Sequence, residues 1–328
     1  MRQTDARWAV VLGAGDGTRL HALTGRGGVI VPKQFCLLQD DSLIDLALRR
    51  AERVVCRARI TVVVAARHRW WWRHDLRRLP ERNVIVQPKN RGTAPGILLP
   101  LLSILARDER ASIVLLPSDH YVDDEATLQA SIEQAFDEIE RDPRGIVLLG
   151  ITPDGPETDY GWIVPGERLA PQTSSVVEFV EKPAPAAARR LLERRAAWNS
   201  FVIVARVDAL LRLYAERAPE LLGRLAGAVT PSGEVDPMAA RRVYAELTAR
   251  DFSRDLLHGS ERSLRLVAVP PCGWTDLGTP ERVATCAQRL TGERTTAERP
   301  SSRVDLLSAL SRFGEDSSRV PAARSAGG

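Results

Sequence analysis

Long apolar segments, paired cysteines and internal repeats are all missing from this chain. It contains no run of about 18 or more apolar residues, the length that a transmembrane helix requires, so we expect no membrane-spanning segment. The apolar stretch at residues 8–12 is short and runs directly into a glycine turn, which is typical of a first strand and not of a signal peptide. We therefore expect a cytoplasmic protein without a membrane partner.

Cysteine is scarce, since the 328 residues include only Cys36, Cys56, Cys272 and Cys286. None of them forms a C-x-x-C pair, and the nearest two are fourteen residues apart. This spacing argues against a zinc site or a redox motif, so we interpret all four as free structural thiols.

A strong charge imbalance is also missing, because 46 lysines and arginines face 42 acidic residues and leave a net charge of +4. The arginines are scattered through amphipathic stretches such as residues 46–59 and 187–195, and no basic stripe is interleaved with aromatic residues. Solvated helix faces explain this pattern, so we predict no nucleic-acid partner.

Apolar strands alternate with helical patterns through the first 150 residues. The runs that predict strands lie at residues 8–15, 59–66, 83–88, 111–122 and 145–153. Because these runs are almost continuously apolar, both faces of the sheet must be covered. The pattern predicts an α/β fold in which helices pack on both faces of a mostly parallel sheet.

The texture of the sequence changes from about residue 156. Short segments there suggest partly antiparallel strands, and residues 207–250 are helical in pattern. After residue 290 the chain becomes rich in serine, arginine, glycine and glutamate. We therefore predict one domain over residues 1–290, followed by a low-complexity and largely disordered tail over residues 291–328.

The first motif is a glycine loop, Leu12-Gly13-Ala14-Gly15-Asp16-Gly17-Thr18-Arg19, directly after the first strand. Alternating glycines let the backbone turn tightly and bring its N–H groups close to phosphates. A dinucleotide fingerprint needs the spacing G-x-G-x-x-G, whereas this loop reads G-x-G-x-G and continues with Arg19. The loop therefore suits a triphosphate better than the cofactor of a dehydrogenase. The alternative is a simple strand-to-helix turn without a binding role.

A second motif, Val31-Pro32-Lys33-Gln34-Phe35, places a lysine after a proline. If it lies near the glycine loop, Lys33 supplies a fixed positive charge there. Arg19 and Lys33 together could then neutralise a leaving pyrophosphate.

G-x-G-T-R-L followed by P-K-Q-F resembles the signature of bacterial mannose-1-phosphate guanylyltransferases, within the wider nucleotidyltransferase family. Further segments resemble the family in the same order along the chain, so that the resemblance spans about residues 8–290. They are QPKNRGTAP (residues 87–95), LLPSDHYV (115–122), DYGWI (159–163), VEFVEKP (177–183), WNS (198–200) and GWTDLGTP (273–280). The resemblance implies a Rossmann-like sheet of the nucleotide-diphospho-sugar transferase type, with the active site at the carboxyl ends of its strands.

The resemblance also implies roles for individual residues, with GTP and mannose 1-phosphate as the substrates. Arg19 and Lys33 would be catalytic. The residues that would bind the nucleotide are Leu12, Gly13, Gly15, Gly17, Thr18, Gln87, Gly92 and Thr93. Those that would bind the sugar phosphate are Gly161, Glu181, Lys182 and Asn199, with Lys182 on the phosphate.

Two aspartates are the candidate metal ligands. Asp119 follows a buried strand, and Asp276 lies in a loop after the apolar run at residues 264–269. Ligands of open α/β sheets gather at such strand ends, and two carboxylates there can hold Mg²⁺, which keeps waters and takes phosphate oxygens. Either aspartate alone is better interpreted as a turn or cap residue, but together, beside the other motifs, they predict a magnesium site.

The chain departs from the family pattern at several positions. Phe201 stands where the family has the glycine of W-N-S-G, Leu277 replaces a common valine, and the stretch between Arg19 and Lys33 is longer than usual. The candidate metal and phosphate residues are all retained, so the reaction type is better defined than the sugar. Glucose 1-phosphate with UTP or dTTP, and a non-catalytic sugar-nucleotide-binding relative, remain alternatives, and the oligomeric state, a homodimer included, is open.

Overall fold

A single nine-stranded sheet organises the computed structural model of the protein, which describes residues 6–26, 29–290 and 304–310. In spatial order its strands are β10 (Gly161–Ala170), β11 (Thr173–Glu181), β13 (Leu264–Val269), β9 (Ile146–Ile151), β12 (Ala197–Arg206), β8 (Ser112–Pro117), β1 (Arg7–Gly13), β6 (Ile60–Ala65) and β7 (Val84–Gln87). Only β12 and β11 run against the other strands, which confirms the mostly parallel sheet.

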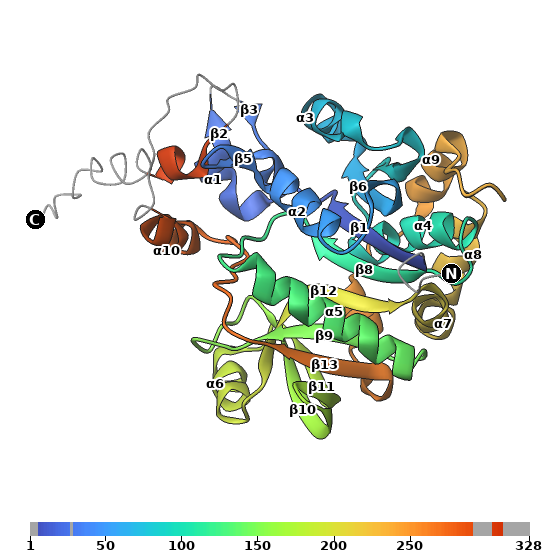
Figure 1. The fold of residues 1–328 in the computed structure, drawn as a ribbon. Helices are drawn as coiled ribbons and strands as arrows, with labels where there is room; N and C mark the ends of the chain where they lie inside the picture. Colours follow the sequence, from blue (N-terminus) through green and yellow to red (C-terminus); the bar gives the residue numbers. More distant parts are fainter. Residues whose placement is uncertain (1–5, 27–28, 291–303, 311–328) are drawn as a thin grey trace, which may run out of the picture.

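Helices cover both faces of this sheet, as predicted (Figure 1). On one face lie α2 (Leu43–Glu52), α3 (Arg69–Asp75), α5 (Glu125–Arg141) and α10 (Pro280–Leu290). On the other lie α4 (Thr93–Leu105), α7 (Val207–Arg217), α8 (Pro219–Ala226) and α9 (Pro237–Glu246). Shorter elements are α1 (His21–Thr24), α6 (Pro185–Glu193), and the hairpins β2 (Gly25–Arg26) with β3 (Val29–Ile30) and β4 (Leu37–Leu38) with β5 (Asp41–Ser42).

The side-chain alternation of the central strands explains the two layers of the core. In β1, Ala9 and Val11 point into the core beneath α2 and α5, whereas Trp8 and Val10 point into the core beneath α4 and α7. The same alternation holds in β8, where all these apolar side chains are buried. A central strand that is apolar at every position therefore serves both layers at once.

The region after β9 follows the predicted change of texture. Strands β10, β11 and β12 are antiparallel to their neighbours, and β10 pairs with β12 as well as with β11. This second pairing brings the start of β10 to the start of β12, beyond the carboxyl end of β9. The segments DYGWI and WNS are thereby placed side by side.

Part of the segment predicted as a disordered tail is packed against the core. Val304, Leu306 and Ala309 are buried, and the carbonyl oxygen of Val304 accepts a hydrogen bond from the backbone N–H of Leu37 (2.8 Å). Residues 304–310 are therefore an ordered part of the segment predicted to be largely disordered, because three apolar side chains meet the surface next to β4. The rest of the segment lies outside the described residues.

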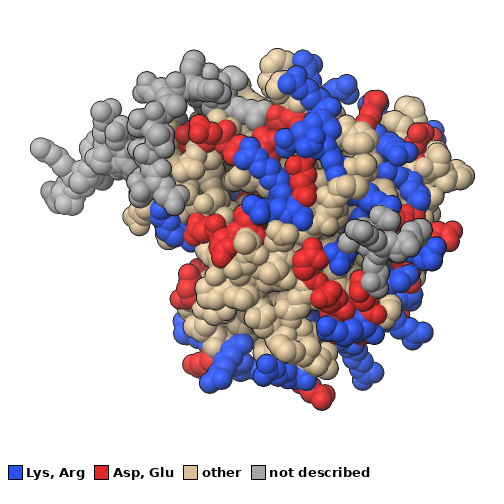
Figure 2. Space-filling model, viewed as in Figure 1, with Lys and Arg blue, Asp and Glu red and all other residues tan. Residues whose placement is uncertain are grey.

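The charged side chains are distributed as the sequence suggested. On the face shown in Figure 2, basic and acidic residues are interspersed, with no continuous basic stripe. Among the described residues no helix is long and apolar enough to span a bilayer. The cysteines carry free thiols, of which only Cys56 is exposed.

Candidate active site

The two sequence motifs meet at the carboxyl end of β1. The side-chain amide of Gln34 donates hydrogen bonds to the carbonyl oxygens of Gly13 (2.8 Å) and Gly15 (2.9 Å). Gly17 has a φ of +60°, and a Cβ placed on it would lie 2.8 Å from the Cβ of Lys33. The glycine loop is thus folded onto the 3-10 turn Lys33–Phe35, which confirms that Lys33 lies beside it.

A cavity of about 410 Å³ opens above the carboxyl ends of β1, β7 and β8. Its wall contains most of the residues predicted to bind the nucleotide: Leu12, Gly15, Gly17, Gln87, Gly92 and Thr93. It also contains Asp119 and His120. Gly13 and Thr18 are not part of the wall; Gly13 lies behind it, where a Cβ would contact the carbonyl oxygen of Val63 at 3.2 Å.

The far side of this cavity is held by residues 244–252, which the sequence motifs did not indicate. Thr93 Oγ1 accepts a hydrogen bond from the backbone N–H of Phe252 (2.7 Å) and donates one to Asp251 (3.2 Å). Gly92 has a φ of +86° and no room for a side chain, because a Cβ would overlap the carbonyl oxygen of Arg250. The side-chain amide of Gln87 donates to the hydroxyl of Tyr244 (3.0 Å), so Gln87 and Gly92, both predicted to bind the nucleotide, have fixed positions.

Lys33 joins the two predicted metal ligands. Its side chain is 5% exposed, and its ammonium donates to Asp119 Oδ2 (2.9 Å) and to the carbonyl oxygen of Asp276. Burial alone would raise the pKa of each carboxyl, but the charge of Lys33 leads the effects that hold both pKa values below their usual range. Asp119 and Asp276 therefore lie together as carboxylates, as the sequence predicted.

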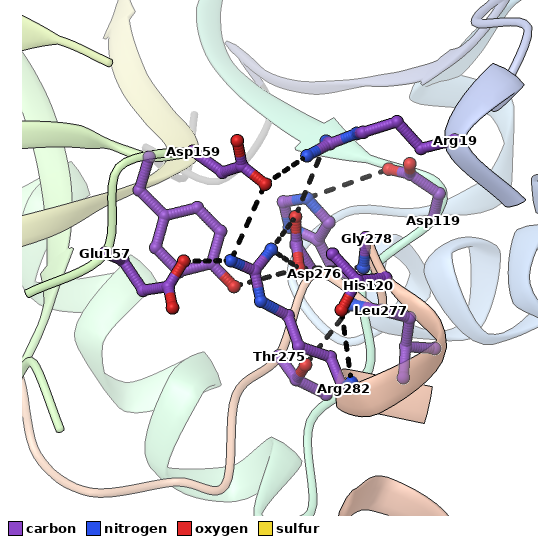
Figure 3. A network of polar contacts seen from close by, with 12 residues as sticks. Arg19, Asp119, His120, Glu157, Asp159, Thr275, Asp276, Leu277, Gly278 and Arg282 are labelled. Atoms are coloured by element: carbon purple, nitrogen blue, oxygen red, sulfur yellow. Dashed lines mark hydrogen bonds and ion pairs between the residues drawn. The ribbon is translucent and has the colours of Figure 1, made fainter. Parts of the chain in front are cut away.

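Asp276 is the centre of the network in Figure 3. Its Oδ1 accepts hydrogen bonds from the Tyr160 hydroxyl (2.9 Å), the Gly278 backbone N–H (2.9 Å) and Arg282 (3.0 Å). The guanidinium of Arg282 also donates to Glu157 and lies 4.3 Å from the centroid of the Tyr160 ring. Sequence reasoning missed Arg282 and Glu157, although Arg282 follows Asp276 by only six residues and was therefore close to a recognised motif.

Arg19 reaches the same network from the glycine loop. It is half-exposed, donates to Asp159 (2.9 Å) and lies 3.8 Å from Asp276 Oδ2. The predicted triphosphate arginine thus stands beside a predicted metal ligand. A triphosphate that engages Arg19 has to compete with Asp159 for it.

The two aspartates fit a magnesium ion by the acceptor capacity they retain. Asp119 Oδ1 lies 3.7 Å from His120 Nε2, and Asp276 Oδ2 has the longer contacts to Arg282 (3.2 Å) and Arg19 (3.8 Å). The described part of the chain contains no cluster of three or more His, Cys, Asp or Glu that could hold an ion by itself. Two carboxylate oxygens suit Mg²⁺, which completes its shell with waters and substrate phosphates.

The residues predicted to bind the sugar phosphate form a second group. A Cβ on Gly161 would lie 2.7 Å from Glu181 Oε2 and 3.3 Å from the Cβ of Asn199, so these three converge. Lys182 follows with a φ of +48°, and its backbone N–H donates to the carbonyl oxygen of Tyr160 (3.2 Å). Burial, and then the charge of Asp251, raise the pKa of Glu181 to about 7.

Phe201 stands between the two groups. The register between β12 and β9 breaks between Asn199 and Ile203, and Phe201 adopts a φ of +60° there, a conformation that favours glycine. Its backbone N–H donates to Asn199 Oδ1 (3.0 Å), and its ring lines the cavity 6.3 Å from the ring of Phe252. The family glycine therefore coincides with a strained position in the wall of this cavity.

A Rossmann-like sheet with a phosphate-type glycine loop and paired carboxylates at its carboxyl edge defines a class of nucleotide-handling proteins. The chain belongs to the nucleotidyl transferase family, whose pattern it matches over residues 8–293.

Individual relatives were found by sequence and by structure. The chain is 31% identical over 286 residues to mannose-1-phosphate guanylyltransferase of Escherichia coli K12, covering 83% of this chain and 58% of that protein. It is 31% identical over 293 residues to a protein of the same name from Salmonella typhimurium, covering 85% of this chain and 59% of that protein. The chain thus spans less than two thirds of the length of these relatives. A solved structure described as mannose-1-phosphate geranyltransferase from Thermus thermophilus shares the fold, with a TM-score of 0.73, 23% identity, and coverage of 88% of this chain and 80% of that one.

Proposed function

We propose that the protein transfers a nucleotidyl group, GMP from GTP, to mannose 1-phosphate, giving GDP-mannose and pyrophosphate. The observation that carries this proposal is the meeting of Lys33, Asp119 and Asp276 between the nucleotide cavity and the convergent Gly161, Glu181 and Asn199. Two substrates bound in these two groups would meet at the carboxylates. The choice of GTP and mannose 1-phosphate rests on the names of the two sequence relatives.

The proposed reaction needs positioning and charge neutralisation rather than a covalent enzyme intermediate. An oxygen of the sugar 1-phosphate attacks the α-phosphorus, the bond from that phosphorus to the bridging oxygen of the β-phosphate breaks, and pyrophosphate leaves. The nucleophile is already an anion, so no general base is required. When bound by Asp119 and Asp276, Mg²⁺ would neutralise charge on the phosphates.

The other charged and polar residues of the site would have separate roles in the reaction. Lys33 holds the Asp119 carboxylate and the backbone carbonyl of Asp276 from its buried position, and its ammonium would add positive charge beside the phosphates. Arg19 would move from Asp159 to the triphosphate and stabilise the leaving pyrophosphate. Lys182 would hold the phosphate of the nucleophile, while Glu181 and Asn199 would accept hydrogen bonds from sugar hydroxyls.

Pyrophosphate release over a matrix of GTP, UTP, dTTP and ATP against mannose 1-phosphate and glucose 1-phosphate tests the proposal. We expect the highest kcat/KM with GTP and mannose 1-phosphate in the presence of Mg²⁺. Asp119→Asn and Asp276→Asn should each lower kcat by about 100-fold or more, the scale of removing one essential electrostatic group. The matched control is Asp208→Asn, which loses a carboxylate that pairs with Arg206 and Arg212 on the surface.

The possible results separate the alternatives. A preference for UTP or dTTP with glucose 1-phosphate would keep the reaction type and overturn the substrates. Tight nucleotide-sugar binding without turnover would make the chain a binding relative. Full activity in excess chelator would overturn the metal assignment.

A further inference from the structure

Arg282 occupies an unusual position between three acidic residues. Its side chain is 17% exposed, and its guanidinium is shared by Asp276, Glu157 and, at 3.9 Å, Asp159 (Figure 3). It reaches them from α10, whereas Glu157 and Asp159 lie in the loop that follows β9. A guanidinium has five N–H donors in a fixed fork, so it can exchange hydrogen bonds between neighbouring carboxylates without leaving the site.

The two oxygens of Asp276 are not equivalent. Oδ1 is saturated by Tyr160, Gly278 and Arg282, whereas Oδ2 has only the 3.2 Å contact to Arg282 and the 3.8 Å contact to Arg19 within the described ranges. A divalent cation on Asp276 would take Oδ2, and it would then stand directly against the guanidinium. The cation and the guanidinium are both positively charged, and like charges in direct contact repel strongly in a partly buried site.

We infer that Arg282 is a positioning residue that competes with the divalent cation for Asp276, and that Glu157 draws it aside when the cation binds. In the ion-free state Arg282 neutralises and orients the Asp276 carboxylate. In the ion-bound state the guanidinium is held by Glu157 and keeps its contact with the Tyr160 ring. The inference rests on the cation site of the proposed function, but it concerns only how tightly that site takes an ion.

Binding of Mn²⁺ to the nucleotide-free full chain, followed by the electron paramagnetic resonance signal of free Mn²⁺, tests the inference without any turnover. Arg282→Met removes the competing charge and keeps much of the side-chain length, so we expect its Kd for Mn²⁺ to be about tenfold lower than that of the parent protein. Arg282→Lys keeps the charge and should stay within about threefold of the parent. Glu157→Gln leaves Arg282 on Asp276 and should weaken Mn²⁺ binding.

Two controls locate the effect. Arg289→Met removes an arginine from the same helix, where it pairs with Asp123, and should leave the Kd unchanged. Asp276→Asn combined with Arg282→Met should abolish the gain in affinity. An unchanged or higher Kd in Arg282→Met overturns the inference, as does a gain that survives Asp276→Asn.

Further measurements distinguish misfolding of a variant, and failure of the proposed function, from failure of this inference. Should Arg282→Met fail to fold by circular dichroism, Glu157→Gln decides, since an unchanged Kd in that variant also overturns the inference. Pyrophosphate release by the parent protein reports on the proposed function alone. A parent protein without transferase activity whose Mn²⁺ affinity still rises in Arg282→Met would refute the function and support the role of Arg282.

Discussion

Gly17 packs directly on the side chain of Lys33, with no space between them for a methyl group. This contact ties the glycine loop to the lysine that joins Asp119 and Asp276. The left-handed φ of +60° at Gly17 makes the position doubly specific for glycine. Any side chain here must move either the glycine loop or the turn that carries Lys33.

Gly17→Ala should therefore lower both stability and activity. We expect a loss of about 1–2 kcal/mol of unfolding free energy from the left-handed backbone, and more if Lys33 cannot shift. Thermal unfolding and pyrophosphate release measure the two effects. Gly15→Ala is the matched control for stability, because a Cβ there meets nothing within 4 Å. Equal melting temperatures for Gly17→Ala and Gly15→Ala would contradict the packing argument.

Arg19 and Lys182 should have separable kinetic roles. A contact that strengthens as charge moves onto pyrophosphate affects kcat, whereas a contact of equal strength before and during attack affects KM. Arg19→Ala should thus lower kcat by roughly 100-fold or more, and Lys182→Ala should mainly raise KM for the sugar phosphate. Steady-state kinetics with each substrate varied in turn distinguish them. A Lys182→Ala variant that lost nucleotide affinity and kept sugar-phosphate affinity would refute the site assignment.

Glu181 should make stability depend on pH near neutrality. Its pKa is raised from 4.5 to about 7 by burial and by Asp251, so the folded protein keeps a proton that the unfolded chain has already lost. The stability that this group contributes is complete below its unfolded pKa and is lost as the pH rises through about 7. In Glu181→Gln that loss is absent, so the melting temperature of the variant relative to the parent should increase from pH 5 to pH 8. A constant difference would show that Glu181 is ionised throughout.

The segment at residues 304–310 should stabilise the domain. Leu306 is fully buried, so Leu306→Ala should cost about 2–5 kcal/mol of unfolding free energy, as other large-to-small core substitutions do. Thermal or urea unfolding measures this loss. Ser308→Ala, at an exposed position of the same segment, is the control. Equal stability of the two variants would mean that the segment does not pack on the core in solution.

Phe201→Gly should alter substrate choice more than stability. The change relieves the left-handed backbone but removes a ring from the cavity wall and its contact with Phe252. These effects oppose each other in the unfolding free energy, whereas the loss of the ring enlarges the space available to a ligand. We expect the ratio of kcat/KM between GTP and UTP to change by about tenfold, on the scale of one methylene group in a pocket. An unchanged ratio would place Phe201 outside the substrate contacts.

Much of the fold was predictable because the apolar pattern is strong. Each central strand is apolar on both faces, and most helices are apolar on one face while α4 is buried on nearly all sides, so their order along the chain follows from burial alone. Strand direction is different, since the antiparallel course of β12 depends on its long-range partners β8 and β9. The burial of Leu306 could not be predicted for the same reason, because its short apolar segment packs on a surface that only the folded chain forms.

Site residues that belong to sequence motifs could be predicted from the sequence. Site residues that are defined only by their neighbours in space could not. Lys33, Asp119 and Asp276 were found because glycine loops and strand ends have recognisable neighbours. Arg282 was not, because an arginine on a helix is usually solvated, and only the folded chain shows three carboxylates around it.

The antiparallel β12 divides the sheet between two stretches of chain. The strands on one side carry the residues predicted to bind the nucleotide, and those on the other, with β12 itself, carry the residues predicted to bind the sugar phosphate. The two predicted groups therefore lie on different strands, and Phe201 of β12 lies beside both of them. The loops next to Gly161, at the start of β10, and next to Glu181, at the end of β11, are therefore the natural places to engineer a preference for another sugar.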